Sequence, residues 1–157
     1  MDSLDRGVDG CRRPAPSVAA DSATGYVHVA YSLQAPEGPG VFFSHSMDGG
    51  VVYHAPVPLV YGERAAATSV AARRDTVVVA YEDPNASPRR IALALSPSMG
   101  HIFEPRVPVS GESVPADAPR VGLGDGVVAV AWRERGAAGE RPTTVVRVGD
   151  FRKTRGA

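Results

Sequence analysis

Short alternating runs of valine and alanine, separated by clusters of Gly, Pro, Asp and Ser, dominate the chain. An apolar period of two residues is typical of β-strands, and no stretch keeps the period of an amphipathic helix for three turns. The pattern therefore predicts an all-β protein.

One pair of strands occurs three times along the chain. The pairs are predicted at 15–21 with 26–32, at 67–72 with 76–82, and at 118–123 with 126–133. The second strand of each pair has a large aromatic residue next to its end, Tyr31, Tyr81 or Trp132, at intervals of 50 and 51 residues. Such constant spacing indicates a structural repeat, and equivalent positions favour packing between units over sugar stacking for these aromatics.

Each unit continues beyond this pair. The first is predicted to have a loop at 34–40, a strand at 41–45 and a fourth strand near 54–61. The second is predicted to have a loop at 83–89 and strands at 90–95 and near 104–109. The third has a loop at 134–141 and a strand at 143–148, with no fourth strand. Residues before Gly10 are expected to supply one, because Gly10 precedes Ser17 by seven residues as Gly62 precedes Ser69.

A turn signature separates the third and fourth strands of the first unit. Its fixed residues are Ser46, Asp48, Gly50 and Tyr53. Asp and Ser side chains bond nearby amides, Gly permits a positive φ, and the aromatic is expected to pack down and anchor the turn. A degraded copy keeps Ser96, Gly100 and Phe103, with Ser98 where Asp48 stands.

These turns resemble the Asp-boxes of the bacterial neuraminidase repeats in the sialidase superfamily, over roughly residues 15–148. The resemblance implies a β-propeller of four-stranded antiparallel blades, three per chain, within a single domain at 1–157. The blades are expected at approximately 15–61, 67–109 and 118–148.

Sialidases of this family close six blades into a ring. The resemblance therefore implies a homodimer that completes a six-bladed ring, in which residues 1–14 form a closing strand and linker. A fragment of a longer propeller is the competing explanation of a three-bladed chain.

Composition excludes several classes of partner. The 17 basic and 17 acidic residues balance, so no electrostatic argument supports binding of nucleic acid or an anionic membrane. No apolar run is long enough to span a bilayer. Residues 1–6 lack the features of a signal peptide, so we expect a cytoplasmic protein as written, or a secreted one if a longer precursor exists. Cys11 is the single cysteine, either a free thiol or a disulfide across a symmetric dimer.

Candidate ligand residues follow from the resemblance, because this family builds its ligand face from two sets of loops. The loops entering the first strands nominate Glu63, Arg64, Glu112, Asp117 and Arg120, and those joining strands two and three nominate Glu82, Asp83, Arg133, Glu134 and Arg135. Arg120 occupies the register of the family's Arg-Ile-Pro motif. Arg64, Arg120 and Arg133 are the predicted ligand-binding residues, since guanidinium groups suit a carboxylate.

The sequence leaves catalysis open. Glu82, Asp83 and Glu134 are the candidate carboxylates for glycoside hydrolysis, but no segment matches the family's Tyr/Glu nucleophile pair or Asp general acid. The four histidines show no metal-ligand spacing, so we expect neither a metal nor a cofactor. The predicted function is a non-catalytic module that binds a glycan or a protein. The alternative is a glycosidase-like or small-molecule enzyme with its active site on the propeller axis of a dimer.

Overall fold

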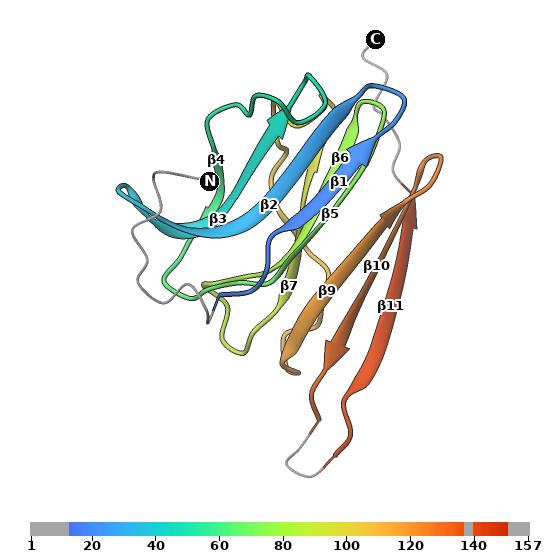
Figure 1. Ribbon diagram of the computed structural model, residues 1–157. Coiled ribbons are helices and arrows are strands. Elements are labelled where there is room, and N and C mark those ends of the chain that lie inside the picture. Colours follow the sequence, from blue (N-terminus) through green and yellow to red (C-terminus); the bar gives the residue numbers. More distant parts are fainter. Residues whose placement is uncertain (1–12, 137–139, 151–157) are drawn as a thin grey trace.

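The computed structural model describes residues 13–136 and 140–150, which form three antiparallel sheets side by side (Figure 1). The expected closing strand before Gly10 and the role of Cys11 lie outside the described residues. The first sheet contains β1 (Ser17–Asp21), β2 (Tyr26–Ala35), β3 (Gly38–Ser46) and β4 (Val57–Tyr61). The second contains β5 (Thr68–Arg73), β6 (Thr76–Glu82), β7 (Ile91–Ser96) and β8 (Val107–Pro108). The third contains β9 (Ala116–Leu123), β10 (Val127–Glu134) and β11 (Thr143–Asp150).

The all-β prediction is confirmed, and the described residues include no helix long and apolar enough to cross a membrane. Strands neighbouring in the sequence are neighbours in each sheet. The three sheets also share one register: in each, the alanine that precedes Tyr31, Tyr81 or Trp132 in the second strand pairs with a residue of the first strand. These pairs are Ala30 with Ser17, Ala80 with Ser69 and Ala131 with Arg120.

The predicted loop at 34–40 is wrong. β2 continues to Ala35 and β3 begins at Gly38, so only Pro36 and Glu37 form the turn. Gly38 has a φ of 140°, a conformation that side chains disfavour and that closes this tight hairpin. The alternation of Tyr31, Leu33 and Ala35 continues the strand through a segment whose Pro and Gly content had suggested a loop.

The fourth strands are shorter than predicted. β4 covers 57–61 rather than 54–61, and β8 covers only 107–108 of the expected 104–109. Within the described residues the third sheet has three strands, so the four-stranded prediction holds for the first two sheets.

The two larger hydrophobic clusters lie in the two seams between sheets. On β6, Val77, Val79 and Tyr81 pack against the first sheet, whereas Val78 and Ala80 pack against the third. Tyr81 is fully buried in the first seam, and Trp132 is 2% exposed in the second. Both aromatics therefore pack between sheets as predicted. Tyr31 is partly buried and lies on the face of the first sheet that is turned away from the second.

The two signature turns make matching hydrogen bonds. The Gly50 amide donates to Ser46 Oγ at 2.9 Å, and the Gly100 amide donates to Ser96 Oγ at 2.9 Å. The Val52 amide donates to Asp48 Oδ1 at 2.9 Å, where the Ile102 amide donates to Ser98 Oγ at 3.0 Å. A serine hydroxyl thus accepts the bond that the Asp48 carboxylate accepts in the complete turn.

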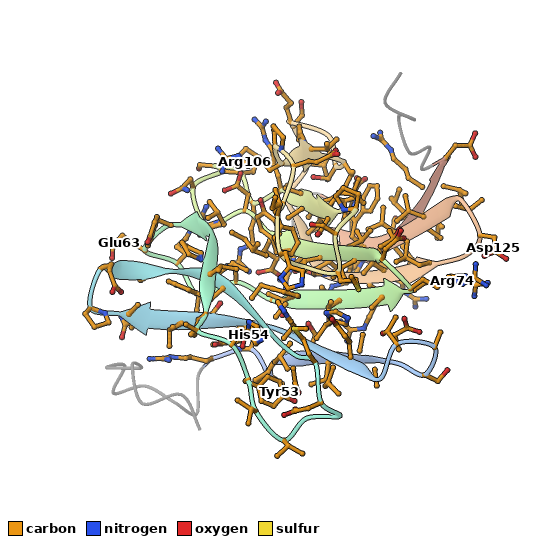
Figure 2. All side chains as sticks on the ribbon, turned by 90° about the horizontal axis from the view of Figure 1, so that it is seen from above. Tyr53, His54, Glu63, Arg74, Arg106 and Asp125 are labelled. Carbon is orange, nitrogen blue, oxygen red and sulfur yellow. The ribbon has the colours of Figure 1, made fainter. Side chains whose placement is uncertain are left out.

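The anchoring aromatics of these turns differ. Phe103 packs edge-on against Phe43 of the first sheet, with ring centroids 4.9 Å apart. Tyr53 occupies the same position in its turn but is 45% exposed, on the outer side of the first sheet (Figure 2). The expectation that the aromatic packs down therefore holds for Phe103 and is wrong for Tyr53, because the described chain has no sheet before the first one.

A histidine cluster lies near the turns at the first seam. His45 is 5% exposed, with ring centroids 4.6 Å from His54, 4.7 Å from His101 and 6.2 Å from His28. His28 is fully buried, and neither of its ring nitrogens nor Nε2 of His45 has a hydrogen-bond partner. Burial, followed by the neighbouring histidines, lowers the pKa of His45 to about 4; burial also lowers the pKa of His28, against the charge of Asp21.

This cluster predicts acid destabilisation between pH 7 and pH 5. A histidine whose pKa is lowered by folding binds protons more tightly in the unfolded chain, so stability is complete above its ordinary pKa of 6.5 and falls below it. We expect the unfolding free energy to drop by about 2 kcal/mol at pH 5 from His45 alone. Urea unfolding at both pH values measures this. His45→Phe should reduce the difference between them, and an unchanged difference in this variant would contradict the assignment.

Candidate functional site

The predicted ligand loops gather at one end of the three sheets, here called the arginine end. Its described loop residues are 62–67, 83–90, 109–115, 135–136 and 140–142. The signature turns at 46–56 and 97–106 lie at the opposite end, here called the turn end. Two cavities open at the arginine end, one at each seam between sheets.

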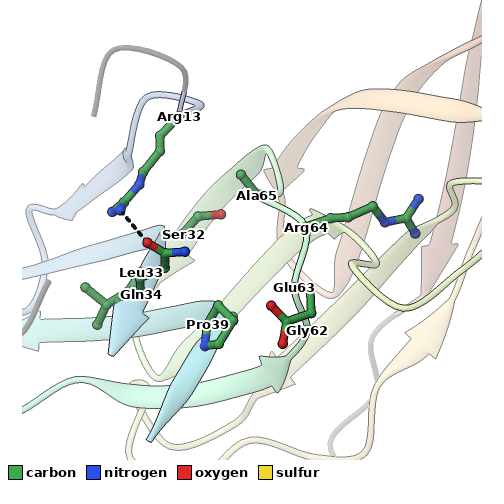
Figure 3. Close-up of a pocket in the computed structure, with 10 residues that line it drawn as sticks. Arg13, Ser32, Leu33, Gln34, Pro39, Gly62, Glu63, Arg64 and Ala65 are labelled. Atoms are coloured by element: carbon green, nitrogen blue, oxygen red, sulfur yellow. Dashed lines mark hydrogen bonds between the residues drawn. The ribbon is translucent and has the colours of Figure 1, made fainter. Parts of the chain in front are cut away.

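The cavity at the first seam has a volume of about 250 Å³ (Figure 3). Arg13 donates a hydrogen bond to Gln34 Oε1 at 3.4 Å along its wall, and Glu63 and Arg64 come from the connection between β4 and β5. The Ser32 hydroxyl donates to the Ala66 carbonyl and accepts from the Ala66 amide, both at 2.8 Å. Ser32 therefore joins the first sheet to the second beside this cavity.

The cavity at the second seam is larger, about 350 Å³, and is rich in arginine. Arg64, Arg89 and Arg135 line it together with Asp117, two prolines flanking the loops, and Ala116. Arg89 was not singled out from the sequence. Its place in the loop between the second and third strands, the loop type that nominated Asp83, was the available signal.

Asp117 is held between two arginines. It is 5% exposed and accepts hydrogen bonds from Arg133 Nε and Arg135 Nε, each at 2.6 Å. Burial by itself opposes ionisation, but the hydrogen bonds and charges of the two arginines outweigh it and lower the pKa of Asp117. Asp117 also raises the pKa of Arg133, so this group is a fixed ion pair at neutral pH.

Glu82 is a buried joint between the second and third sheets. It is 6% exposed, and its Oε1 accepts a hydrogen bond from the Ala118 amide at 3.0 Å. Its Oε2 accepts from the Ala67 amide at 3.5 Å and from Arg89 Nη1 at 3.4 Å. Ala118 has a φ of 54°, a left-handed conformation that is strained for alanine, and the bond to Glu82 helps to hold it.

The arginines keep exposed N–H groups in spite of these contacts. Arg64 donates through Nε to the Pro84 carbonyl at 3.0 Å and through Nη2 to the Ala86 carbonyl. The side chains of Arg89, Arg133 and Arg135 are 47%, 46% and 60% exposed. Each guanidinium has five N–H donors, so donors remain for a ligand.

The other candidate residues lie apart from this cavity or already have hydrogen-bond or ion-pair partners within the protein. Asp83 Oδ1 accepts from the Asn85 amide at 2.9 Å, and Glu134 Oε1 accepts from Trp132 Nε1 at 3.0 Å. Glu112 pairs with Arg90 at 2.9 Å and is exposed. Arg120 pairs in register with Ala131, on the face of the third sheet turned away from the second, and donates to the Pro119 carbonyl at 2.8 Å. The structure therefore brings Arg64 and Arg133 near Asp117 but places Arg120 elsewhere.

In the part of the chain that the structure describes, no three His, Cys, Asp or Glu side chains are arranged to hold a metal ion. The chemistry available at the second seam is recognition by guanidinium groups around two buried carboxylates. A planar anionic group with two oxygens, such as a carboxylate, matches these guanidinium donors best.

Comparisons with known proteins place the fold. Neither a scan against known protein families nor a search of curated proteins found a match. Among solved structures, a Hadza microbial sialidase is similar with a TM-score of 0.55 and 14% identity, over 84% of this chain and 30% of that chain. The catalytic domain of the GH62 α-L-arabinofuranosidase of Coprinopsis cinerea is similar with a TM-score of 0.52 and 16% identity, over 92% of this chain and 50% of that chain.

Both similar proteins are β-propeller glycosidases, so the predicted sialidase-like propeller is confirmed at the level of the fold. This chain spans half of their length or less. At these identities the likeness concerns the fold alone.

Replacing Glu82 tests whether it is a structural joint. Glu82→Ala leaves the partly buried Ala118 amide without its acceptor, so we expect a loss of roughly 2–4 kcal/mol in unfolding free energy. Glu82→Gln retains one acceptor oxygen and should lose less. Urea unfolding measures both, with the exposed Glu63→Ala as the matched control. Equal stability of Glu82→Ala and the control would show that Glu82 does not join the sheets.

Proposed function

We propose that the cavity at the second seam binds a carboxylate-bearing glycan without cleaving it. The observation that carries the proposal is the convergence of Arg64, Arg89 and Arg135 on one cavity of about 350 Å³. Asp117 is the one carboxylate among the residues that line this cavity with the three arginines, which leaves two positive charges in excess in the lining. A bidentate arginine is a strong and geometrically selective partner for a carboxylate.

The state of the acidic groups supports binding rather than cleavage. A glycosidase requires one carboxyl that donates a proton and a second that acts as nucleophile or base. Asp117 is kept ionised by two arginines, and both oxygens of Glu82 accept hydrogen bonds from the protein. Neither group is arranged to deliver a proton to a leaving sugar.

Two further observations support a glycan as the ligand class. The turns at 46–53 and 96–103 resemble the Asp-boxes of sialidases, and their hydrogen bonds match one another. The similar folds belong to a sialidase and an arabinofuranosidase. Because those proteins are glycosidases, glycoside hydrolysis remains the second candidate function, with Glu82, Asp83 and Glu134 as its carboxylates and a site on the axis of a dimer.

Binding of sugar acids tests the proposal. We expect N-acetylneuraminic or glucuronic acid glycans to bind more tightly than their neutral counterparts on a glycan array and in calorimetry, with affinity falling as salt rises. Arg89→Ala should weaken binding about tenfold, the loss expected for one charge-assisted hydrogen bond. Arg135→Lys retains the charge but removes the planar fork, so a smaller loss is expected.

Arg73→Ala is the matched control, because Arg73 lies at the turn end and pairs with the exposed Asp125. Equal binding of neutral and acidic glycans, or unchanged affinity in Arg89→Ala, would contradict the proposal. Release of a fluorescent aglycone from an aryl glycoside, abolished by Glu82→Gln, would instead support the second candidate.

A further inference from the structure

Two faces of the sheet array have no sheet of the described chain against them. Strands of the first and third sheets both pack on the second. The opposite face of the third sheet and the opposite face of the first sheet are here called the trailing face and the leading face. Because the three sheets share one register, each position on these faces has an equivalent inside a seam.

The trailing face of the third sheet carries apolar residues at positions that are buried in the two seams, but here these residues are exposed. Val146 pairs with Ala131 as Leu93 pairs with Ala80 and Phe43 with Ala30. Phe43 is 0% and Leu93 is 8% exposed in their seams, whereas Val146 is 60% exposed. Val148 on the same face is 67% exposed.

The leading face of the first sheet shows the same contrast over part of its area. Val18 pairs with Val29 as Val70 pairs with Val79, yet Val18 is 62% exposed and Val70 is 8% exposed. Toward the arginine end, Leu33 and Phe42 are buried in a small cluster of their own. The exposed apolar surface on this face therefore lies along β1 and toward the turn end.

Two anchoring residues also lack the neighbour that their equivalents have. Phe103 packs on Phe43 of the preceding sheet, while its equivalent Tyr53 is 45% exposed. Ser32, Glu82 and Arg133 are equivalent, since each directly follows the aromatic residue of its second strand. Ser32 bonds Ala66 and Glu82 bonds Ala118, which both belong to the following sheet, whereas Arg133 bonds Asp117 of its own sheet. Tyr53 lies at the leading face, and Arg133 lies at the edge of the trailing face.

We propose that a second copy of this chain covers both faces, with the trailing face of each copy against the leading face of the other. Faces of these two kinds already meet twice within one chain, so they are complementary by construction. The contact is heterologous, and two such contacts close a symmetric pair of three-sheet chains into a ring of six sheets. This inference stands on the exposed faces and does not depend on what the arginine cavity binds.

The mass of the protein in solution tests the pair. We expect light scattering at micromolar concentration to give twice the 16.4 kDa of one chain, without growth at higher concentration. Val146→Asp and Val148→Asp place a charge in the contact and should convert the pair to monomers that retain the β-sheet circular dichroism spectrum. Val107→Asp is the matched control, since Val107 is 54% exposed on β8 of the second sheet, which lies between the first and third sheets, and the substitution should leave the pair intact.

A disulfide tests the register of the contact. Across the second seam, the Val121 amide donates to Ser69 Oγ at 3.1 Å. Ser17, Ser69 and Arg120 are equivalent, because they pair with Ala30, Ala80 and Ala131. Arg120 therefore corresponds to Ser69, and Val18, which follows Ser17, corresponds to Val121. The equivalent pair between copies is Arg120 of one chain and Val18 of the other. In a Cys11→Ser background, Arg120→Cys with Val18→Cys should form covalent dimers on oxidation, and either cysteine variant alone should not.

A monomer at every concentration would overturn the proposal and show that these faces serve other sheets of a longer polypeptide or another partner. Assemblies that grow with concentration would overturn the closed pair, because a heterologous contact that does not close forms open chains. A dimer that Val146→Asp leaves intact would also overturn it.

Discussion

The packing of sheet against sheet is the constraint on which the rest of this structure depends. A strand that lies between two neighbouring sheets must be apolar on both faces, and β6 shows this most clearly. Val77, Val79 and Tyr81 bury against one neighbour while Val78 and Ala80 bury against the other. Close approach of the inner strands follows from the small residues that they carry, such as Ala19 and Ala72.

The polar joints across the seams determine what chemistry the arginine end can offer. Ser32 and Glu82 occupy equivalent positions; Ser32 bonds Ala66 in the connection that enters the second sheet, and Glu82 bonds Ala118 in β9 of the third sheet. Glu82 and Asp117 are committed to such contacts, so these acidic groups have structural partners while the arginines retain exposed donors. The formal charge of the chain is balanced, yet the charge around this one cavity is not. Total charge therefore says little about the preference of a local site.

Much of the fold could be predicted because period-two alternation and the aromatics at 31, 81 and 132 are local features of the sequence. Strand ends were less predictable. Leu33 and Ala35 extend β2 across a segment rich in Pro and Gly, since pairing with β3 outweighs local composition there. For the site, loop position nominated Arg64, Asp117, Arg133 and Arg135 but not Arg89, and it included Arg120, which faces away from the cavity. Whether an arginine points into a seam or away from it depends on strand register and on a β-bulge between Ala131 and Arg133.

The sequence by itself determined the strand pairs, the repeat and the positions that must be apolar, because these follow from residue type and spacing along the chain. Only the tertiary structure decided which polar groups are buried and hydrogen-bonded within the protein. Asp48 and Ser98 accept equivalent turn hydrogen bonds, while Glu82 and Asp117 are buried against amides and guanidiniums from segments far away in the sequence. Hydrogen bonding and burial of such groups depend on atoms brought together across the seams, and spacing along one chain contains no measure of that distance.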